Sequence, residues 1–79
     1  MTIDDFIKSL GIMEERRYSY GEVASMLKVD KRTVEGWCNV GLRNRRYGPV
    51  VMEKFRLGGA TLIMGRSVIE FLRKTQRDN

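Results

Sequence analysis

The sequence contains no histidine, one cysteine and one proline among its 79 residues. The lone cysteine, Cys38, cannot form a disulfide within the chain, and the lack of histidine excludes zinc sites built from Cys/His clusters and histidine-based catalysis. No apolar run approaches the roughly 20 residues of a membrane-spanning helix, and the first residues lack the charged-then-apolar pattern of a signal peptide. We therefore expect a cytoplasmic protein without a cofactor, a metal site or catalytic residues.

Positive charge is concentrated in the middle of the chain. Residues 1–27 carry three basic and five acidic side chains, residues 28–56 carry eight and three, and residues 57–79 carry four and two. The central segment alone therefore matches the formal net charge of +5. A local basic field of this kind favours a polyanionic partner, either nucleic acid or an acidic membrane surface. A lysine- and arginine-rich surface in contact with solvent alone is the alternative.

Capping residues and apolar spacing predict two short helices in the first third of the chain. Residues 3–10 have apolar side chains at helical spacing, preceded by Thr2 at the N-cap position. Ser19 and Glu22 form a capping box at the start of a second helix, which we expect to end near Lys28. No repeat or linker interrupts the sequence, so we expect one domain over residues 1–79.

A third helix is predicted from Lys31 to about Asn39, with Asp30 as its N-cap. Because only three or four residues separate it from the second helix, the two must fold against each other as a helix-turn-helix over about residues 20–40. Its apolar seam consists of Val34, Trp37 and Cys38. Its exposed face consists of Lys31, Arg32, Thr33, Glu35, Gly36 and Asn39. Such a polar face, with donors near the helix N-terminus, suits the major groove of DNA, although an ordinary solvated face would look similar.

The later part of the sequence predicts a β-hairpin over about residues 54–64 and a closing helix over about residues 66–75. The Gly58-Gly59 pair suits a two-residue turn, which aligns Lys54 with Ile63 and places Ile63 on an otherwise polar face. We expect residues 42–53 to form an irregular loop. The hairpin and this loop together form a second candidate site, since a glycine tip lets the backbone approach phosphates. Its residues are Arg43, Arg45, Arg46, Lys54, Arg56, Gly58, Gly59 and Thr61.

Two segments carry a family resemblance: YSYGEVASMLKVDKRTVEGWCNVGL at 18–42 and KFRLGGATLIMGRSVIEFL at 54–72. Together they resemble the excisionase-type, MerR-like winged helix-turn-helix family, over about residues 18–75. The shared motifs are Tyr18–Glu22, Glu22-Val23-Ala24, Asp30–Val34, Gly41-Leu42, Gly58-Gly59 and Phe71-Leu72. The spacing of Thr33, Val34, Trp37 and Gly41 is also similar to the DNA-binding domain of phage terminase small subunits. The segment from Arg43 to Glu53 is longer and richer in arginine than the family pattern, and the helix over 3–10 lies outside it.

The resemblance implies a mainly α winged helix-turn-helix fold that binds double-stranded DNA. The recognition helix would lie in the major groove through Lys31, Arg32, Thr33, Glu35 and Gly36. The wing would contact the adjacent backbone or minor groove through Arg56, Gly58, Gly59 and Thr61. We expect a nucleoid-associated accessory factor of a mobile element, either an excisionase-like directionality factor or a repressor. Its partners would be DNA, further copies of itself and a recombinase, with no membrane and no small-molecule substrate. A DNA-binding or protein-interaction module of a terminase-like packaging complex is the alternative.

Overall fold

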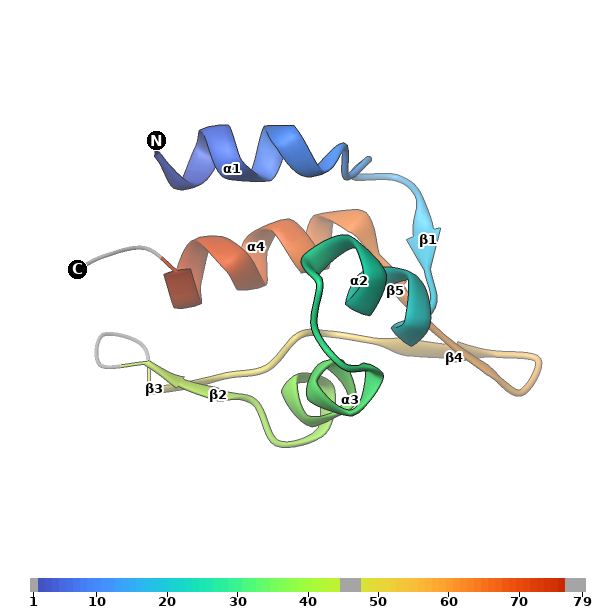
Figure 1. The fold of residues 1–79 in the computed structure, drawn as a ribbon. Helices are drawn as coiled ribbons and strands as arrows, with labels where there is room; N and C mark the ends of the chain where they lie inside the picture. Colours follow the sequence, from blue (N-terminus) through green and yellow to red (C-terminus); the bar gives the residue numbers. More distant parts are fainter. Residues whose placement is uncertain (1, 45–47, 77–79) are drawn as a thin grey trace.

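The computed structural model describes residues 2–44 and 48–76, and within them four helices and five short strands form a mixed α/β fold (Figure 1). The helices are α1 (Ile3–Leu10), α2 (Tyr20–Leu27), α3 (Lys31–Asn39) and α4 (Gly65–Gln76). The strands are β1 (Arg17–Tyr18), β2 (Leu42–Asn44), β3 (Gly48–Val50), β4 (Phe55–Leu57) and β5 (Ala60–Met64). The helix ranges agree with the predicted ones to within one or two residues. The expectation of a mainly α fold is only approximate, because five strands contribute to the described structure.

Local capping explains where α1 and α2 begin and end. The Thr2 hydroxyl accepts a hydrogen bond from the Asp5 backbone N–H at 3.1 Å, and Gly11 ends α1 in the left-handed conformation. At α2 the predicted capping box is present in full, with Ser19 and Glu22 each accepting from the other's backbone N–H. Lys28 ends α2 with φ of 58°, a conformation that turns the chain directly into α3.

The strands form two separate antiparallel sheets. One has the order β1-β5-β4, so that β5 is central, and the other consists of β2 and β3. The β4–β5 register pairs Arg56 with Thr61 and Leu57 with Ala60, as predicted from the Gly58-Gly59 turn. Lys54 lies before the first paired residue and does not join the ladder.

The core lies where α2, α3, α4 and β5 meet. Its fully buried side chains, each at most 2% exposed, are Val23, Val34, Met52, Ile63, Val68 and Phe71. Helix α1 covers α4 on the far side from α3, where it buries Ile7 (Figure 1).

The segment expected to be an irregular loop is instead structured over most of its length, which corrects the prediction for residues 42–53. Leu42 pairs with Val50 across the β2–β3 hairpin, and Met52 is fully buried. The backbone N–H of Met52 donates to the carbonyl of Trp37 at 3.0 Å, which fastens this segment to α3. Strands of three residues are too short to produce a recognisable alternation of apolar and polar residues, so β2 and β3 have no clear sequence signal.

Ile63 shares a face with Thr61 and Arg56, as predicted, but that face is not polar along its whole length. Ile63 is fully buried, whereas Thr61 on the same face is half-buried and Arg56, paired with Thr61, is exposed. The hairpin leaves the body of the domain, so one of its faces lies in the core at the base and in solvent near the tip. Strand β1, which pairs Tyr18 with Ile63, helps to enclose the base.

The start of α4 is capped from a distance. The backbone N–H groups of Gly65 and Arg66 donate to the carbonyls of Arg16 and Glu14, at 2.8 and 3.1 Å. A side chain at position 65 would collide with the carbonyl oxygen of Met13, so this close approach requires glycine. The segment after α1 therefore provides the acceptors that α4 lacks within its own first turn.

Candidate nucleic-acid interface

Helix α3 divides into an anchored face and an exposed face. Val34 and Cys38 are buried, and the half-buried Trp37 ring packs against Phe71 with 5.1 Å between ring centroids. On the other side Lys31, Arg32, Thr33, Glu35 and Asn39 are exposed. Gly36 lies between these faces, and a Cβ added there would meet no atom within 4 Å. The predicted exposed residues of α3 therefore share one open, uncrowded surface.

The N-terminus of α3 is open and positively charged. Asp30 occupies the N-cap position, but its side chain makes no capping hydrogen bond, and the first turn contains no acidic residue. Lys31 and Arg32 stand there instead, although a helix N-terminus favours negative charge. An anion placed at this end would relieve the unfavourable arrangement.

The turn between α2 and α3 fixes how this surface is presented. The N–H of Lys28 donates to the carbonyls of Ala24 and Ser25, and the N–H of Val29 donates to Ala24 at 2.9 Å. Val29 packs against the core as a partly buried residue. With both ends of the turn bonded, α3 is held at a defined angle to α2.

The β4–β5 hairpin ends in an open glycine turn. Gly58 and Gly59 have φ of 56° and 87°, so both central residues have the positive φ of a type I′ turn. Neither glycine has an atom within 4 Å of an added Cβ, and Arg56 and Leu57 beside them are exposed. The tip is therefore free to approach another molecule closely.

The hairpin base and α3 meet around Tyr20 and Cys38. Burial raises the pKa of the Tyr20 hydroxyl, with Cys38 and Glu35 adding to the rise and Arg56 opposing it. Burial likewise raises the pKa of the Cys38 thiol, opposed by Lys54 and reinforced by Glu35. The charge of Arg56 therefore acts on Tyr20 and that of Lys54 on Cys38, and Glu35 of α3 acts on both groups. The base of the hairpin segment thus lies on the side of α3 that carries Glu35 and Cys38.

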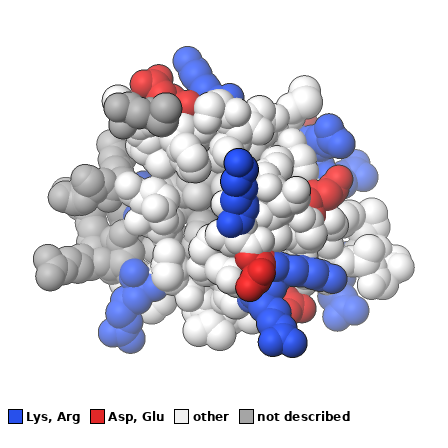
Figure 2. Space-filling view, in the orientation of Figure 1, with Lys and Arg blue, Asp and Glu red and all other residues white. Residues whose placement is uncertain are grey.

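Two ion pairs join α4 to the N-terminal segment, away from α3 and the β4–β5 hairpin. Arg66 pairs with Glu15 at 3.1 Å and Arg73 pairs with Asp4 at 3.2 Å, so cations of α4 neutralise acids of the N-terminal segment. By contrast Lys31, Arg32, Lys54 and Arg56 form no ion pair with any described residue. Figure 2 shows lysine and arginine side chains at the lower right with carboxylates among them, and further ones at the top, the centre, the lower left and the upper right of this face.

Among the described residues of the predicted second site, Arg43 lies apart from Lys54 and Arg56. Arg43 is exposed on β2, and the β2–β3 hairpin extends from α3 in the opposite direction to the β4–β5 hairpin (Figure 1). Arg45 and Arg46 lie outside the described residues. The grouping of Arg43 with Lys54 and Arg56 is therefore wrong, because α3 lies between the two hairpins. Of the two hairpins, the base of β4–β5 lies near Glu35 and Cys38 of α3.

Two residues of this region were missed in the sequence. Lys28 is exposed at the turn before α3 and adds a cation beside Lys31. Leu57 is 56% exposed at the end of β4. The alternation along β4 already places Leu57 on the same face as Phe55, but the sequence did not indicate that this face leaves the core before it reaches the tip.

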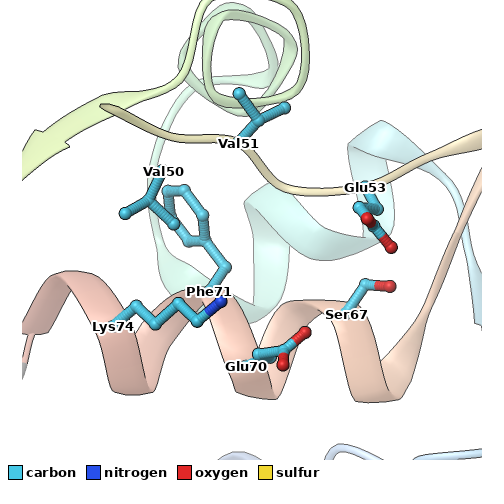
Figure 3. Close-up of a pocket in the computed structure, with 7 residues that line it drawn as sticks. All are labelled: Val50, Val51, Glu53, Ser67, Glu70, Phe71 and Lys74. Carbon is cyan, nitrogen blue, oxygen red and sulfur yellow. The ribbon is translucent and has the colours of Figure 1, made fainter. Parts of the chain in front are cut away.

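A shallow hollow lies elsewhere, between α4 and the chain that links β3 to β4. It measures about 210 Å³ including open solvent, and Val50, Val51, Glu53, Ser67, Glu70, Phe71 and Lys74 line it. In Figure 3, Val51 points toward α3 and away from the α4 side of the hollow, while Val50 lies beside Phe71. Only about 20 Å³ of the hollow can hold the centre of a water-sized sphere, which is room for little more than one water molecule. It provides no enclosed site for a small molecule.

The described residues show no features of two other types of site. Over residues 2–44 and 48–76, no helix is long and apolar enough to cross a membrane. Histidine, cysteine, aspartate and glutamate side chains form no group of three or more that could hold a metal ion in this part of the chain. The exposed surface of α3 and the adjoining hairpin is therefore the principal candidate site. No protein-family model, curated protein or solved structure matches the chain.

Proposed function

We propose that the chain binds double-stranded DNA as a winged helix-turn-helix factor, with α3 as the recognition helix and the β4–β5 hairpin as the wing. The observation that carries the proposal is the set of exposed cations on these two adjoining elements, which have no ion-pair partner among the described residues. Unpaired cations on one surface are what a phosphate backbone neutralises. The activity proposed is binding, without turnover.

The proposal assigns different tasks to the two elements. Arg32 and Thr33, near the open N-terminus of α3, supply donors to base edges in the major groove, and Gly36 lets the helix backbone approach closely. Arg56 and the glycine turn contact phosphates and position the protein without reading sequence. Glu35 discriminates, because a carboxylate accepts a hydrogen bond from a cytosine amino group but repels phosphates.

The biological role that fits this activity is that of an accessory or regulatory factor of a mobile element. An excisionase-like factor would use the wing to arrange neighbouring copies and a recombinase on DNA, and a repressor would occupy a promoter. Both roles require sequence-specific binding to a duplex, so one binding experiment tests their common basis.

The test is a fluorescence anisotropy titration on two duplexes: one selected from a random pool by repeated binding, and one of mixed sequence. Affinity should fall linearly with salt on a log–log plot, with a slope of about −0.9 for each phosphate contacted. Arg32→Ala should cost about 1–3 kcal/mol on the selected duplex and less on the mixed one.

The matched control is Lys8→Ala, which removes an exposed cation from the last turn of α1, outside α3 and the hairpin. It should bind both duplexes like the parent. An equal loss from Lys8→Ala and Arg32→Ala would show that only overall charge attracts the DNA. Absence of binding to either duplex at low salt would refute the proposed function.

A further inference from the structure

The end of the β4–β5 hairpin combines an exposed apolar side chain with positive charge. Leu57 is 56% exposed, and Ala60, its partner across the ladder, is also exposed. Toward the base of the same face, the paired Phe55 and Leu62 are half-buried. This apolar face therefore continues past the body of the domain and ends in solvent at Leu57.

The charge of the β4–β5 hairpin around Leu57 limits which kinds of molecule could cover this side chain. Arg56 is exposed on the opposite face, and the segment 54–64 contains two cations and no acidic residue. In Figure 2 the hairpin tip, at the right-hand end of the molecule, is white with basic side chains beside it. A complementary partner must therefore be apolar where Leu57 enters it and anionic beside that point, where Arg56 lies.

The base stack of duplex DNA, flanked by its two phosphate backbones, has this arrangement. We infer that Leu57 inserts between two base pairs in the minor groove and kinks the bound duplex, an inference that rests on the proposed DNA binding. A two-residue glycine turn without side chains lets a two-stranded ribbon reach the floor of a narrow groove. Apolar wedges of this kind unstack a base step and bend DNA toward the major groove.

An anionic membrane also has phosphates above an apolar interior, but the amount of apolar surface argues against it. A whole myristoyl chain gives only marginal membrane binding by itself, and a leucine side chain is much smaller. At a base step a single side chain is sufficient, because α3 and Arg56 would already hold the protein on the duplex. The tip is therefore matched to DNA rather than to lipid.

The test uses a duplex of about 30 base pairs with a fluorophore at each end and a central TA step, which is among the steps most easily kinked. Bending is measured by energy transfer between the ends, and unstacking by the reactivity of thymines toward permanganate. Three variants are compared with the parent: Leu57→Ala, Leu57→Phe as a wedge of a different shape, and Met13→Ala. Met13 is 62% exposed in the turn after α1, so its truncation removes similar apolar surface away from the hairpin.

We expect the parent to increase both energy transfer and thymine reactivity. Leu57→Ala should lower thymine reactivity about fivefold or more while weakening affinity by about tenfold at most, because the phosphate contacts remain. Leu57→Phe should retain the bend, and Met13→Ala should behave like the parent. Circular dichroism and melting should show that all variants are folded.

Each contrary outcome has a distinct meaning. If the parent binds with the expected salt dependence but Leu57→Ala leaves bending and reactivity unchanged, the wedge is refuted and the proposed function stands. If the parent binds no duplex, the proposed function and the wedge both fail. If Leu57→Ala instead abolishes binding to vesicles of phosphatidylglycerol and phosphatidylcholine, with binding to the duplex unaffected, the tip is a membrane contact and the inference is overturned.

Discussion

Helices α2 and α3 are consecutive, similar in length and packed against each other, yet they begin in opposite ways. At α2 the Ser19 hydroxyl and the Glu22 carboxylate satisfy two backbone N–H groups, at 3.1 and 2.9 Å. At α3 the Asp30 side chain caps nothing, and the first turn is basic. The first turn of α2 therefore has the side-chain caps that stabilise a helix. The first turn of α3 lacks such a cap and carries two basic residues, which the helix dipole disfavours.

Helix α3 also has an unfavourable residue in its interior. Helix α3 carries Gly36 in its interior, where glycine costs about 1 kcal/mol relative to alanine. The buried seam of Val34 and Cys38, with Trp37 against Phe71, offsets this cost. We conclude that α3 is held by the packing of its buried face, rather than by its cap or by the helix propensity of its residues. The comparison can be tested by changing one helix at a time.

The largest expected effect is on the stability of the domain, when the Trp37 ring that packs α3 against Phe71 is removed. Trp37→Ala removes the contact with Phe71 and should lower the free energy of unfolding by about 3–5 kcal/mol. In a domain this small, that loss approaches the total stability. Thermal unfolding followed by circular dichroism measures it.

The control is Val40→Ala, which truncates a side chain that is 78% exposed at the C-cap of α3. It should change stability by no more than about 0.5 kcal/mol. A Trp37→Ala variant that melts like the parent but no longer binds DNA would show that the ring contacts the partner instead of anchoring the helix.

The next effect contrasts the two N-caps. Ser19→Ala should cost about 1 kcal/mol of stability, because it removes a side-chain cap from α2. Asp30→Ala should cost clearly less, since no capping bond is lost, and it should strengthen DNA binding by removing a negative charge near Lys31 and Arg32. Urea unfolding and anisotropy titrations of both variants provide the measurements. Equal stability losses would mean that Asp30 caps α3 in solution.

Gly36→Ala tests whether α3 sacrifices stability for close approach. The added methyl group meets no atom within 4 Å, so the variant should be more stable than the parent by about 0.5–1 kcal/mol. Its DNA binding should be weaker if the backbone of α3 lies against the duplex. A variant with higher stability and unchanged affinity would remove Gly36 from the interface.

The smallest effect concerns the junction between α3 and the hairpin. Because burial raises the pKa of Cys38 above its ordinary value of 9.0, the folded state holds this proton more tightly than the unfolded state. The contribution of Cys38 to stability should be fully present below pH 9.0 and be lost as the pH rises through the folded-state pKa. Cys38→Ala should flatten this fall in urea unfolding measured at several alkaline pH values. An unchanged slope would assign the fall to other groups, such as Tyr20.

The parts of the fold that local signals specify could be predicted from the sequence. The caps at Thr2 and Ser19 located α1 and α2, and the Gly58-Gly59 turn fixed the register of the β4–β5 hairpin. The pairing of Arg17 with Met64 and of Leu42 with Val50 could not be predicted, because these strands are only two to five residues long. Their partners are selected by the packing of the whole domain.

In the candidate site, too, some features could be predicted from local sequence and others depend on tertiary packing. The exposed face of α3 could be read from its apolar seam, because a helix has a fixed periodicity. The proximity of Glu35 to Lys54 and Arg56 could not, since it depends on how the hairpin base packs beside α3. The separation of Arg43 from the hairpin has the same origin. Sequence periodicity identifies a face, but only tertiary packing shows which faces adjoin.

The distant capping of α4 has a consequence for how the chain folds during synthesis. The first N–H groups of α4 bond to the carbonyls of Arg16 and Glu14, and Gly65 contacts Met13. The ribosome delivers these acceptors long before it delivers the helix that uses them. Until α4 has left the exit tunnel, the segment after α1 has unpaired carbonyls and the core lacks Val68 and Phe71. We therefore expect the domain to acquire its fold only once α4 is free to pack, rather than element by element as translation proceeds.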